Sequence, residues 1–380
     1  MTPAKCDAPM SDPSEKPDKP TVAATLNLLR PAVRAMPPYV PGEQIPDLVK
    51  LNTNEGAYPP SPRVMQALAA IADESLRLYP DPVSSRLRAA AAARFGVPAE
   101  CIIAGNGSDD CLTMLYRGFL DAGERAACPW PTYGLYETLA TLQGAELVRV
   151  PFRVSGRRWQ LPPALTRQGA KLIVLANPNN PSATLIPVAD LRALCDAATD
   201  AVVVVDEAYV DFATAAGTDA SVLPHLQQHP NLVVLRTLSK SYSLAGARLG
   251  LLFAAAPIVD ALNKVKDSYN VNAITQAIGV AALEDRATHE QAVRRTLDER
   301  TRLERELAAL GISWPESAAN FLLCEIGPRA EAVYLALKQQ GLVVRWWRTP
   351  ELTSKVRITV GKPAENDRLL AALAGALRAT

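Results

Sequence analysis

Three side chains that could take part in catalysis each stand at the end of a short apolar run or just after one. They are Asn177, Asp206 and Lys240. The runs are 172–176, 202–206 and 232–237. If the runs are parallel strands, their carboxyl ends meet at the edge of the sheet where such sheets bind ligands. An Asp-Glu pair after a strand is often only a helix cap, and a Ser-Lys pair is often only surface. The combination nevertheless favours one crevice that holds an amide, a carboxylate and an amine.

A fourth signal is the glycine-rich segment 105–110 (GNGSDD), which follows apolar residues 101–104 and precedes the amphipathic stretch 111–119. A strand, a tight turn and a helix start together offer free backbone N–H groups and a positive dipole end, which suit a phosphate. The segment matches neither the dinucleotide fingerprint nor a Walker A loop. Ser239 and Arg248 could add a hydroxyl and a guanidinium to the same phosphate. The alternative is an ordinary helix cap after a turn.

An amine, a carboxylate, an amide and a phosphate site on one rim meet the requirements of pyridoxal 5′-phosphate. A lysine amine forms a Schiff base with the aldehyde of this cofactor, and a carboxylate pairs with its pyridinium nitrogen. The sequence therefore predicts a pyridoxal-phosphate site formed around Lys240 and Asp206.

The elements that must position these residues have an α/β pattern. From about 59 to 274, β-branched runs alternate with Ala- and Leu-rich amphipathic stretches, which is typical of a parallel sheet covered by helices. The expected strands are 101–104, 125–128, 146–150, 172–176, 202–206, 232–237 and 249–253. A smaller α+β part follows, in which we expect a long helix at 281–309, strands at 321–324, 342–345 and 356–360, and helices at 329–340 and 365–378.

Composition excludes several classes of protein. The chain has 380 residues with 40 basic and 39 acidic side chains, so it lacks the basic surplus of a nucleic-acid-binding protein. Its 48% hydrophobic content is that of a globular protein, and its apolar runs are too short to cross a bilayer. We expect no nucleic-acid or membrane partner.

The six cysteines form no metal-binding or disulfide pattern, and we expect free buried thiols. The three histidines are expected in loops or on the surface, so no metal site is predicted. The first residues are polar and Pro-rich and lack the apolar segment of a secretory signal. We therefore expect a disordered tail and a cytoplasmic protein.

At this point the motifs as a set show a family resemblance. The chain resembles the class II aminotransferases of the fold-type I pyridoxal-phosphate superfamily, and among them most closely the histidinol-phosphate aminotransferases. The motifs are KLNTNEGAYPPSP (50–62), YPDP (79–82), GNGSDD (105–110), PTYGLY (131–136), NPNNPSA (177–183), VDEAY (205–209), TLSKSYSLAGARLG (237–250) and VRITVG (356–361). The implied fold is a three-layer, mostly parallel sheet with flanking helices plus a smaller α+β domain.

The resemblance implies roles for the catalytic residues. Lys240 would be the Schiff-base lysine that then moves a proton between the substrate and the cofactor. Asp206 would hold the pyridinium proton, and Asn177 and Tyr209 would hydrogen-bond the phenolic oxygen of the ring. Tyr133 would stack on the ring face.

The resemblance also implies how phosphate and substrate are held. The phosphate would bind the turn at Gly107, Ser108 and Asp109, together with Ser239, Arg248 and the partner subunit's Tyr79. Arg357 resembles the arginine that binds the α-carboxylate of glutamate. Arg345 resembles the arginine that helps to accept the phosphate of histidinol phosphate. Tyr58 and Asn177 would complete the substrate site.

The implied activity is transamination between histidinol phosphate and 2-oxoglutarate in histidine biosynthesis, in a ping-pong cycle through pyridoxamine phosphate. An aromatic amino-acid aminotransferase and a pyridoxal-phosphate-dependent phospho-amino-acid decarboxylase remain alternatives, and a non-catalytic regulatory module is a further one. The chain departs from the family at Gly56, Tyr242 and Ser243. It also carries Trp346 and Trp347 next to Arg345, which could favour an aromatic substrate or could simply pack the small domain.

The resemblance further implies a homodimer with shared active sites, in which an apolar arm near 25–40 packs on the partner subunit. We expect a disordered tail (1–22), an arm with part of the small domain (23–56), a large cofactor-binding domain (57–274) and a small C-terminal domain (275–380).

Overall fold

A computed structural model describes residues 21–36, 48–71 and 74–379. The described residues form two compact units, which are divided after position 39. The first contains helices α1 (Val22–Asn27) and α2 (Pro31–Ala35). The Thr21 hydroxyl caps α1 by accepting a hydrogen bond from the backbone N–H of Ala24 at 3.1 Å. The expected disordered tail lies outside the described residues, except for Thr21 and Val22, which cap and begin α1.

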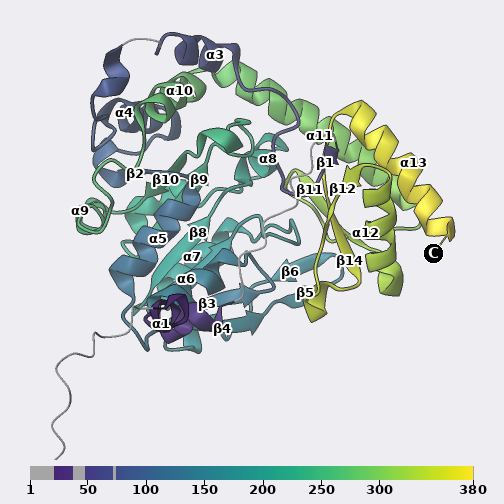
Figure 1. The fold of residues 1–380 in the computed structure, drawn as a ribbon, viewed down its shortest axis with the longest axis horizontal. Coiled ribbons are helices and arrows are strands. Elements are labelled where there is room, and N and C mark those ends of the chain that lie inside the picture. The colour runs from purple at the N-terminus through teal and green to yellow at the C-terminus, as the bar shows by residue number, and fades with distance from the viewer. Residues whose placement is uncertain (1–20, 37–47, 72–73, 380) are drawn as a thin grey trace, which may run out of the picture. The chain divides into compact units, whose positions relative to one another are not determined.

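The second unit is built on a seven-stranded sheet with the strand order β2-β10-β9-β8-β7-β3-β4 (Figure 1). These strands are β2 (Ile102–Gly105), β3 (Arg125–Trp130), β4 (Glu146–Pro151), β7 (Leu172–Ala176), β8 (Val202–Asp206), β9 (Leu232–Thr237) and β10 (Gly250–Phe253). Strand β10 runs antiparallel to both of its neighbours, and the other pairs are parallel. The predicted α/β class with a mostly parallel sheet is therefore confirmed.

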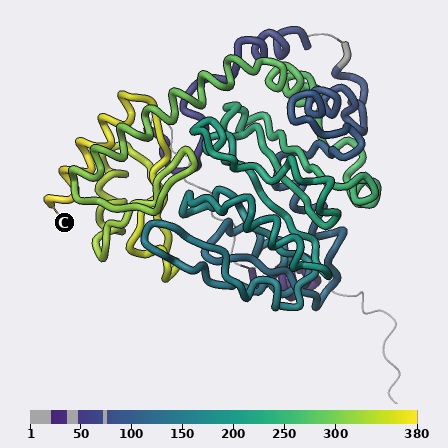
Figure 2. The backbone as a smooth tube through the Cα atoms, turned by 180° about the vertical axis from the view of Figure 1, so that it is seen from behind, coloured from purple at the N-terminus to yellow at the C-terminus, as the bar shows by residue number. Residues whose placement is uncertain are grey.

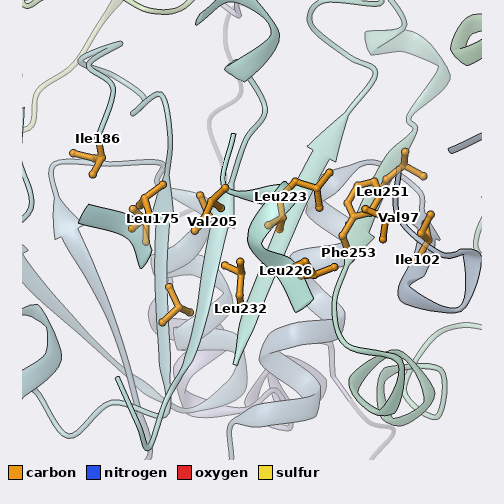
Figure 3. Packing of buried hydrophobic residues seen from close by; sticks show 14 of the residues in the cluster. Val97, Ile102, Leu175, Ile186, Val205, Leu223, Leu226, Leu232, Leu251 and Phe253 are labelled. Atoms are coloured by element: carbon orange, nitrogen blue, oxygen red, sulfur yellow. The ribbon is translucent and has the colours of Figure 1, made fainter. Parts of the chain in front are cut away.

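Helices cover both faces of this sheet. Successive residues of each strand point to opposite faces, so each strand contributes side chains to the packing on both sides. In β8, Val203 and Val205 enter one hydrophobic cluster and Val204 enters the other. The first cluster, part of which is shown in Figure 3, includes α4 (Ser85–Phe95), α7 (Val188–Ala197) and α10 (Ala273–Glu284). The second includes α5 (Ser108–Phe119), α6 (Leu135–Gln143) and α9 (Ala256–Leu262). Burial on both faces explains why these strands are apolar throughout.

The three central strands carry the predicted site residues at their carboxyl ends. Ala176, Asp206 and Leu235 are neighbours across β7, β8 and β9. Asn177 donates its backbone N–H to the carbonyl of Asp206 at 2.8 Å. The register therefore fixes the start of the three loops at one edge of the sheet.

The C-terminal part, drawn in yellow-green to yellow in Figures 1 and 2, has its own hydrophobic core. An antiparallel sheet of β11 (Phe321–Glu325), β14 (Lys355–Thr359) and β13 (Arg345–Trp346) packs with α12 (Ala330–Gln339) and α13 (Pro363–Ala379). Strand β1 (Val49–Lys50) pairs in parallel with β12 (Leu342–Val343), and Leu51 joins this core. A segment from near the N-terminus is thus built into the C-terminal part.

Some elements differ from the expected ones. The helix expected at 281–309 is divided into α10 and α11 (Arg286–Ala309), because Asp285 leaves the helix and its side chain caps α11 at Thr288. The strand expected at 342–345 is divided between two sheets. The hairpin β5 (Arg153–Ser155) and β6 (Arg158–Gln160) and the helices α3 (Pro62–Ala69) and α8 (Val210–Ala215) complete the α-helices and strands of the described residues. Among the described residues, no helix has the length and apolar character needed to cross a membrane.

Candidate active site

Asp206 is a buried carboxylate at the end of β8, only 5% exposed. It accepts hydrogen bonds from the backbone N–H of Ala208 at 3.1 Å and from the Tyr136 hydroxyl at 3.3 Å. Burial raises the pKa of Asp206 to about 7, while these hydrogen bonds and the charge of Lys240 oppose the shift. A cationic N–H donor in contact with it would offset the cost of burial.

Lys240 lies in the loop after β9, and its amine reaches the segment that follows β1. The Nζ atom donates to the Thr53 carbonyl at 2.9 Å and lies 5.8 Å from the centre of the Tyr209 ring. Gly56 approaches the same loop so closely that a Cβ there would be 2.8 Å from the Lys240 carbonyl. The Ser243 side chain lies closer still to that position, and the family usually has glycine at 243, so glycine at 56 leaves room for this serine. Tyr209 in turn accepts a hydrogen bond from the Asn54 side chain at 3.0 Å.

The turn before α5 forms a cradle for an anion. Gly107 has φ +85°, and a Cβ there would be 2.5 Å from Nη2 of Arg248. No side chain caps the start of α5, so backbone N–H groups in its first turn are available to a ligand. Arg248 binds the Asp109 carboxylate at 3.0 Å beside this turn. The buried Ser239 accepts a hydrogen bond from the Thr237 hydroxyl at 3.0 Å.

Two tyrosines connect this cradle to Asp206. Tyr133 donates its hydroxyl hydrogen to Asp109 at 3.3 Å and packs edge-on against Tyr136, with ring centres 5.7 Å apart. The Tyr136 hydroxyl donates to Asp206. A chain of contacts thus runs from the phosphate cradle to the buried carboxylate, with the Tyr133 ring in the middle.

Arg357 on β14 is the buried cation of the site, only 6% exposed. Its guanidinium donates to the side-chain oxygen of Asn180 and to the Asn52 carbonyl, the latter at 2.6 Å. Burial, and to a lesser extent the charge of Arg345, lowers the pKa of Arg357 to about 10, so the group stays charged at neutral pH. Its Nε is buried without a hydrogen-bond partner among the described residues.

Arg345 and Arg357 are direct partners across β13 and β14, so both project from the same face. In the part of the chain that the structure describes, no carboxylate forms an ion pair with either guanidinium. Two like charges held together without an ion-paired carboxylate favour an anionic ligand.

Three predicted site residues lie apart from these contacts. The Asn177 side chain is engaged with the backbone of Ile186, accepting from its N–H at 2.7 Å and donating to its carbonyl at 3.2 Å. Tyr58 is buried under the Arg295 guanidinium, 3.9 Å from the ring centre. Tyr79 is 80% exposed and stacks on Tyr269 with ring centres 4.4 Å apart.

The structure also brings in residues that the sequence analysis did not select. Asn180, three positions after Asn177, contacts Arg357. The Thr53 carbonyl accepts from Lys240, and the Asn52 carbonyl accepts from Arg357. The repeated asparagines of NPNNPSA were a signal for Asn180. Nothing local in LNTN pointed to the two carbonyls, because their partners lie more than 180 residues away.

A buried polar network contacts Ser241 and Tyr242, the two residues that follow Lys240 in its loop. Tyr242 stacks on His289 with ring centres 3.9 Å apart and accepts a hydrogen bond from Arg94 at 3.2 Å. Asp211 accepts from the Ser241 hydroxyl at 2.5 Å, and His289 lies 3.7 Å from the same carboxylate. The expected surface placement is wrong for His289, which is 7% exposed on α11, and for His229, which is 6% exposed.

Arg236 extends this network toward Asp206. Its guanidinium pairs with Asp211 at 2.9 Å and with Glu207, the residue after Asp206, at 2.9 Å. Burial alone would raise the pKa of Asp211, but His289 and Arg236 hold it well below its usual range. The residues that follow Lys240 and Asp206 are therefore tied to each other through Arg236 and Asp211.

These features fit pyridoxal phosphate. Among the described residues, no cationic N–H group hydrogen-bonds Asp206 in the way a protonated pyridine ring would, and the turn at Gly107 provides backbone donors next to Arg248. Tyr133 lies between the two positions. Among the described residues, no group of three or more His, Cys, Asp or Glu side chains is arranged to hold a metal ion.

Comparison with known proteins identifies the family. The family model of aminotransferase class I and II matches residues 46–373. The chain is 41% identical over 357 residues to histidinol-phosphate aminotransferase 1 of Trichormus variabilis, covering 93% of this chain and 99% of that protein. It is 42% identical over 351 residues to histidinol-phosphate aminotransferase of Synechocystis, covering 91% and 97%.

Solved structures agree with this assignment. The crystal structure of histidinol-phosphate aminotransferase from Sinorhizobium meliloti in complex with pyridoxal 5′-phosphate is similar with a TM-score of 0.85 and 27% identity, covering 93% of this chain and 98% of that one. The predicted aminotransferase is thereby confirmed. The chain belongs to the class I and II aminotransferases, a family of enzymes that depend on pyridoxal phosphate.

Proposed function

We propose that this enzyme transfers an amino group between L-histidinol phosphate and 2-oxoglutarate, as a cytoplasmic homodimer in histidine biosynthesis. The observation that carries the proposal is the pair Arg345 and Arg357, two neighbouring guanidiniums with no ion-paired carboxylate among the described residues, on the face that contacts Asn180 and residue 52. Such a pair suits substrates that end in an anion. The names of the relatives support the choice of histidinol phosphate.

Different residues of the chain would perform the separate parts of the reaction. Pyridoxal phosphate, when bound, supplies an aldehyde for amine attachment and a ring that accepts electrons. Lys240 would provide the amine that holds it and would move the proton at the substrate carbon. Asp206 would keep a proton on the ring nitrogen, and its burial makes that ion pair strong. Tyr209 would hydrogen-bond the ring oxygen, as the resemblance implies. Asn180 would do so in place of Asn177, because the Asn177 side chain is already engaged with both backbone groups of Ile186 and would position the loop instead.

The remaining predicted residues would hold the two anions. Gly107, Ser108 and Asp109, with Ser239 and Arg248, would surround the cofactor phosphate. Arg357 would bind the carboxylate of glutamate, and Arg345 would join it for the phosphate of histidinol phosphate. Tyr58 would act through Arg295 at the wall of the substrate site.

The surface around Tyr79 supports a shared active site. Tyr79 and Tyr269 stack on each other while exposed, and the same stretch leaves large apolar side chains open to solvent. These are Met65, Leu68, Leu76, Leu78 and Val83. Neighbouring apolar residues of this kind are typical of protein interfaces. We infer that a second copy covers them and receives Tyr79 at its cofactor phosphate.

The test is a product assay on the holoenzyme with L-histidinol phosphate and 2-oxoglutarate. The proposal predicts one glutamate formed per histidinol phosphate consumed. L-Histidinol phosphate has no carboxyl group to lose, so the decarboxylase alternative is tested with a phospho-amino acid such as O-phospho-L-threonine. Carbon dioxide released from that substrate, without glutamate formed from histidinol phosphate, would indicate a decarboxylase. Glutamate formed from phenylalanine but not from histidinol phosphate would indicate an aromatic amino-acid aminotransferase.

A further inference from the structure

Two adjacent tryptophans follow Arg345 and project in different directions. The Trp346 ring stacks on Tyr334 of α12 at 6.1 Å, and its indole N–H donates to the Thr353 carbonyl at 2.9 Å. It packs against the core of the C-terminal part. Trp346 is therefore a packing residue of that core.

Trp347 packs instead against the hydrophobic cluster of the seven-stranded sheet. Its ring is shared by two cations, because the Arg345 guanidinium carbon lies 5.5 Å from the ring centre and that of Arg357 lies 5.3 Å from it. An indole face attracts guanidinium groups. The ring thus offsets part of the repulsion between the two arginines and holds them side by side.

The two arginines are anchored differently. Arg357 is also fixed by hydrogen bonds to Asn180 and to the Asn52 carbonyl, and it keeps an unpartnered buried Nε among the described residues. Arg345 packs against the Trp347 ring, and no side-chain hydrogen bond fixes its guanidinium among the described residues. A singly charged carboxylate can be bound by Arg357, whereas a doubly charged phosphate gains from both guanidiniums.

We propose that Trp347 is a specificity-determining residue. Its ring keeps Arg345 beside Arg357 and so favours substrates that end in a phosphate monoester over substrates that end in a carboxylate. This inference rests on the proposed function, in which these two arginines bind the substrate anion.

The chain offers a matched control, since Trp346→Leu removes an indole of the same size from the neighbouring position. We would measure, for wild type, Trp347→Leu and Trp346→Leu holoenzymes, the KM for glutamate in its half-reaction and the inhibition constant of inorganic phosphate in that reaction. Trp347→Leu should raise the phosphate constant by roughly five- to thirtyfold, and the ratio of this constant to the glutamate KM by at least about fivefold. In Trp346→Leu this ratio should stay within about twofold of wild type.

An equal change of the ratio in the two variants, or no change in Trp347→Leu, would overturn the inference. If Trp347→Leu does not fold, Trp347→Phe provides the test, because phenylalanine keeps a smaller ring. It should raise the ratio of the phosphate constant to the glutamate KM by roughly two- to fivefold. An unchanged ratio in Trp347→Phe would then overturn the inference. Failure of the proposed function is seen separately, as wild-type enzyme that uses glutamate but not L-histidinol phosphate. The phosphate measurement is independent of that result.

Discussion

Asp206 shows most clearly how burial prepares one residue for a cofactor. It sits at the end of a central strand with Ala208 and Tyr136 as neutral hydrogen-bond donors. A buried carboxylate in such surroundings favours its protonated form unless a cation contacts it. The ring nitrogen of pyridoxal phosphate would provide that contact.

The raised pKa of Asp206 makes a prediction about stability. The folded pKa of about 7 exceeds the ordinary value of 3.8, so the folded cofactor-free protein binds this proton more tightly than the unfolded chain does. The carboxyl therefore costs nothing at low pH and destabilises the fold increasingly as pH rises through 4 to 7. Replacing Asp206 with Asn should stabilise the cofactor-free protein by about 2–3 kcal/mol more at pH 8 than at pH 5. Urea unfolding of both proteins at both pH values measures this.

Parallel pH profiles for wild type and Asp206→Asn would contradict that account. In the holoenzyme the same substitution should lower kcat at least about a hundredfold, because the ring loses its counter-charge. A near-normal kcat would mean that the ring lies elsewhere.

Asn177 and Asn180, two of the three asparagines in the NPNN motif, should differ in what their substitution impairs. Asn180→Ala removes the partner of Arg357 and should raise the KM for glutamate roughly tenfold or more, since a hydrogen bond to a charged group is lost. Asn177→Ala leaves the Ile186 backbone unpaired and should lower the unfolding free energy by about 1–3 kcal/mol. Steady-state kinetics and urea unfolding of both variants separate the effects. Equal kinetic defects would reject this division.

Asn177 and Asn180 also show which features of single residues cannot be predicted from the sequence. The motif located the loop, because a polar run after a buried strand is visible in the sequence. Which asparagine turns toward Arg357 depends on the path of the loop between β7 and Ile186, and Arg357 itself comes from another part of the chain. No local pattern encodes that choice.

At the scale of elements, the strand ends were predictable and the supports were not. Runs such as Val202–Val205 predicted central strands, and their register brings Asp206 beside the strand that leads to Lys240. The network around Asp211 joins α4, α8, α11 and β9, and its members are separated by up to about two hundred residues. In the sequence, Tyr242 could be recognised only as a departure from the family, and its role in this network could not be predicted.

That network predicts a graded loss of stability. Tyr242→Phe keeps the stack on His289 but loses the hydrogen bond from Arg94, and it should lower the unfolding free energy by about 1 kcal/mol. His289→Ala removes the buried ring beside Asp211 as well and should cost about 2–4 kcal/mol. Urea unfolding of the cofactor-free proteins gives both numbers. The reverse order would show that the stack contributes less than the hydroxyl.

At the scale of the whole molecule, the site is assembled from segments far apart in the chain. Residues 52–56 contact the Lys240 loop, and the backbone of Asn52 binds Arg357. Hydrophobic periodicity predicts elements but not these long-range contacts, so only the motifs taken together indicated the site.

The shared site predicts complementation between two inactive variants. Mixing Lys240→Ala with Tyr79→Ala under conditions of subunit exchange should restore activity, because each hybrid dimer contains one site with an intact lysine and an intact tyrosine from the partner. Complete exchange should give about a quarter of wild-type activity, since half of the dimers are hybrids with one working site of two. Activity that stays at the sum of the separate variants would place Tyr79 in its own subunit's site.

The most direct test of the central claim is rapid-mixing absorption spectroscopy of the holoenzyme with L-histidinol phosphate, for wild type and for Lys240→Ala. The account predicts that the visible band of the bound cofactor is lost in wild type within one turnover and returns when 2-oxoglutarate is added, while Lys240→Ala shows no such cycle. A wild-type band that L-histidinol phosphate leaves unchanged, or a Lys240→Ala variant that cycles at the wild-type rate, would contradict it.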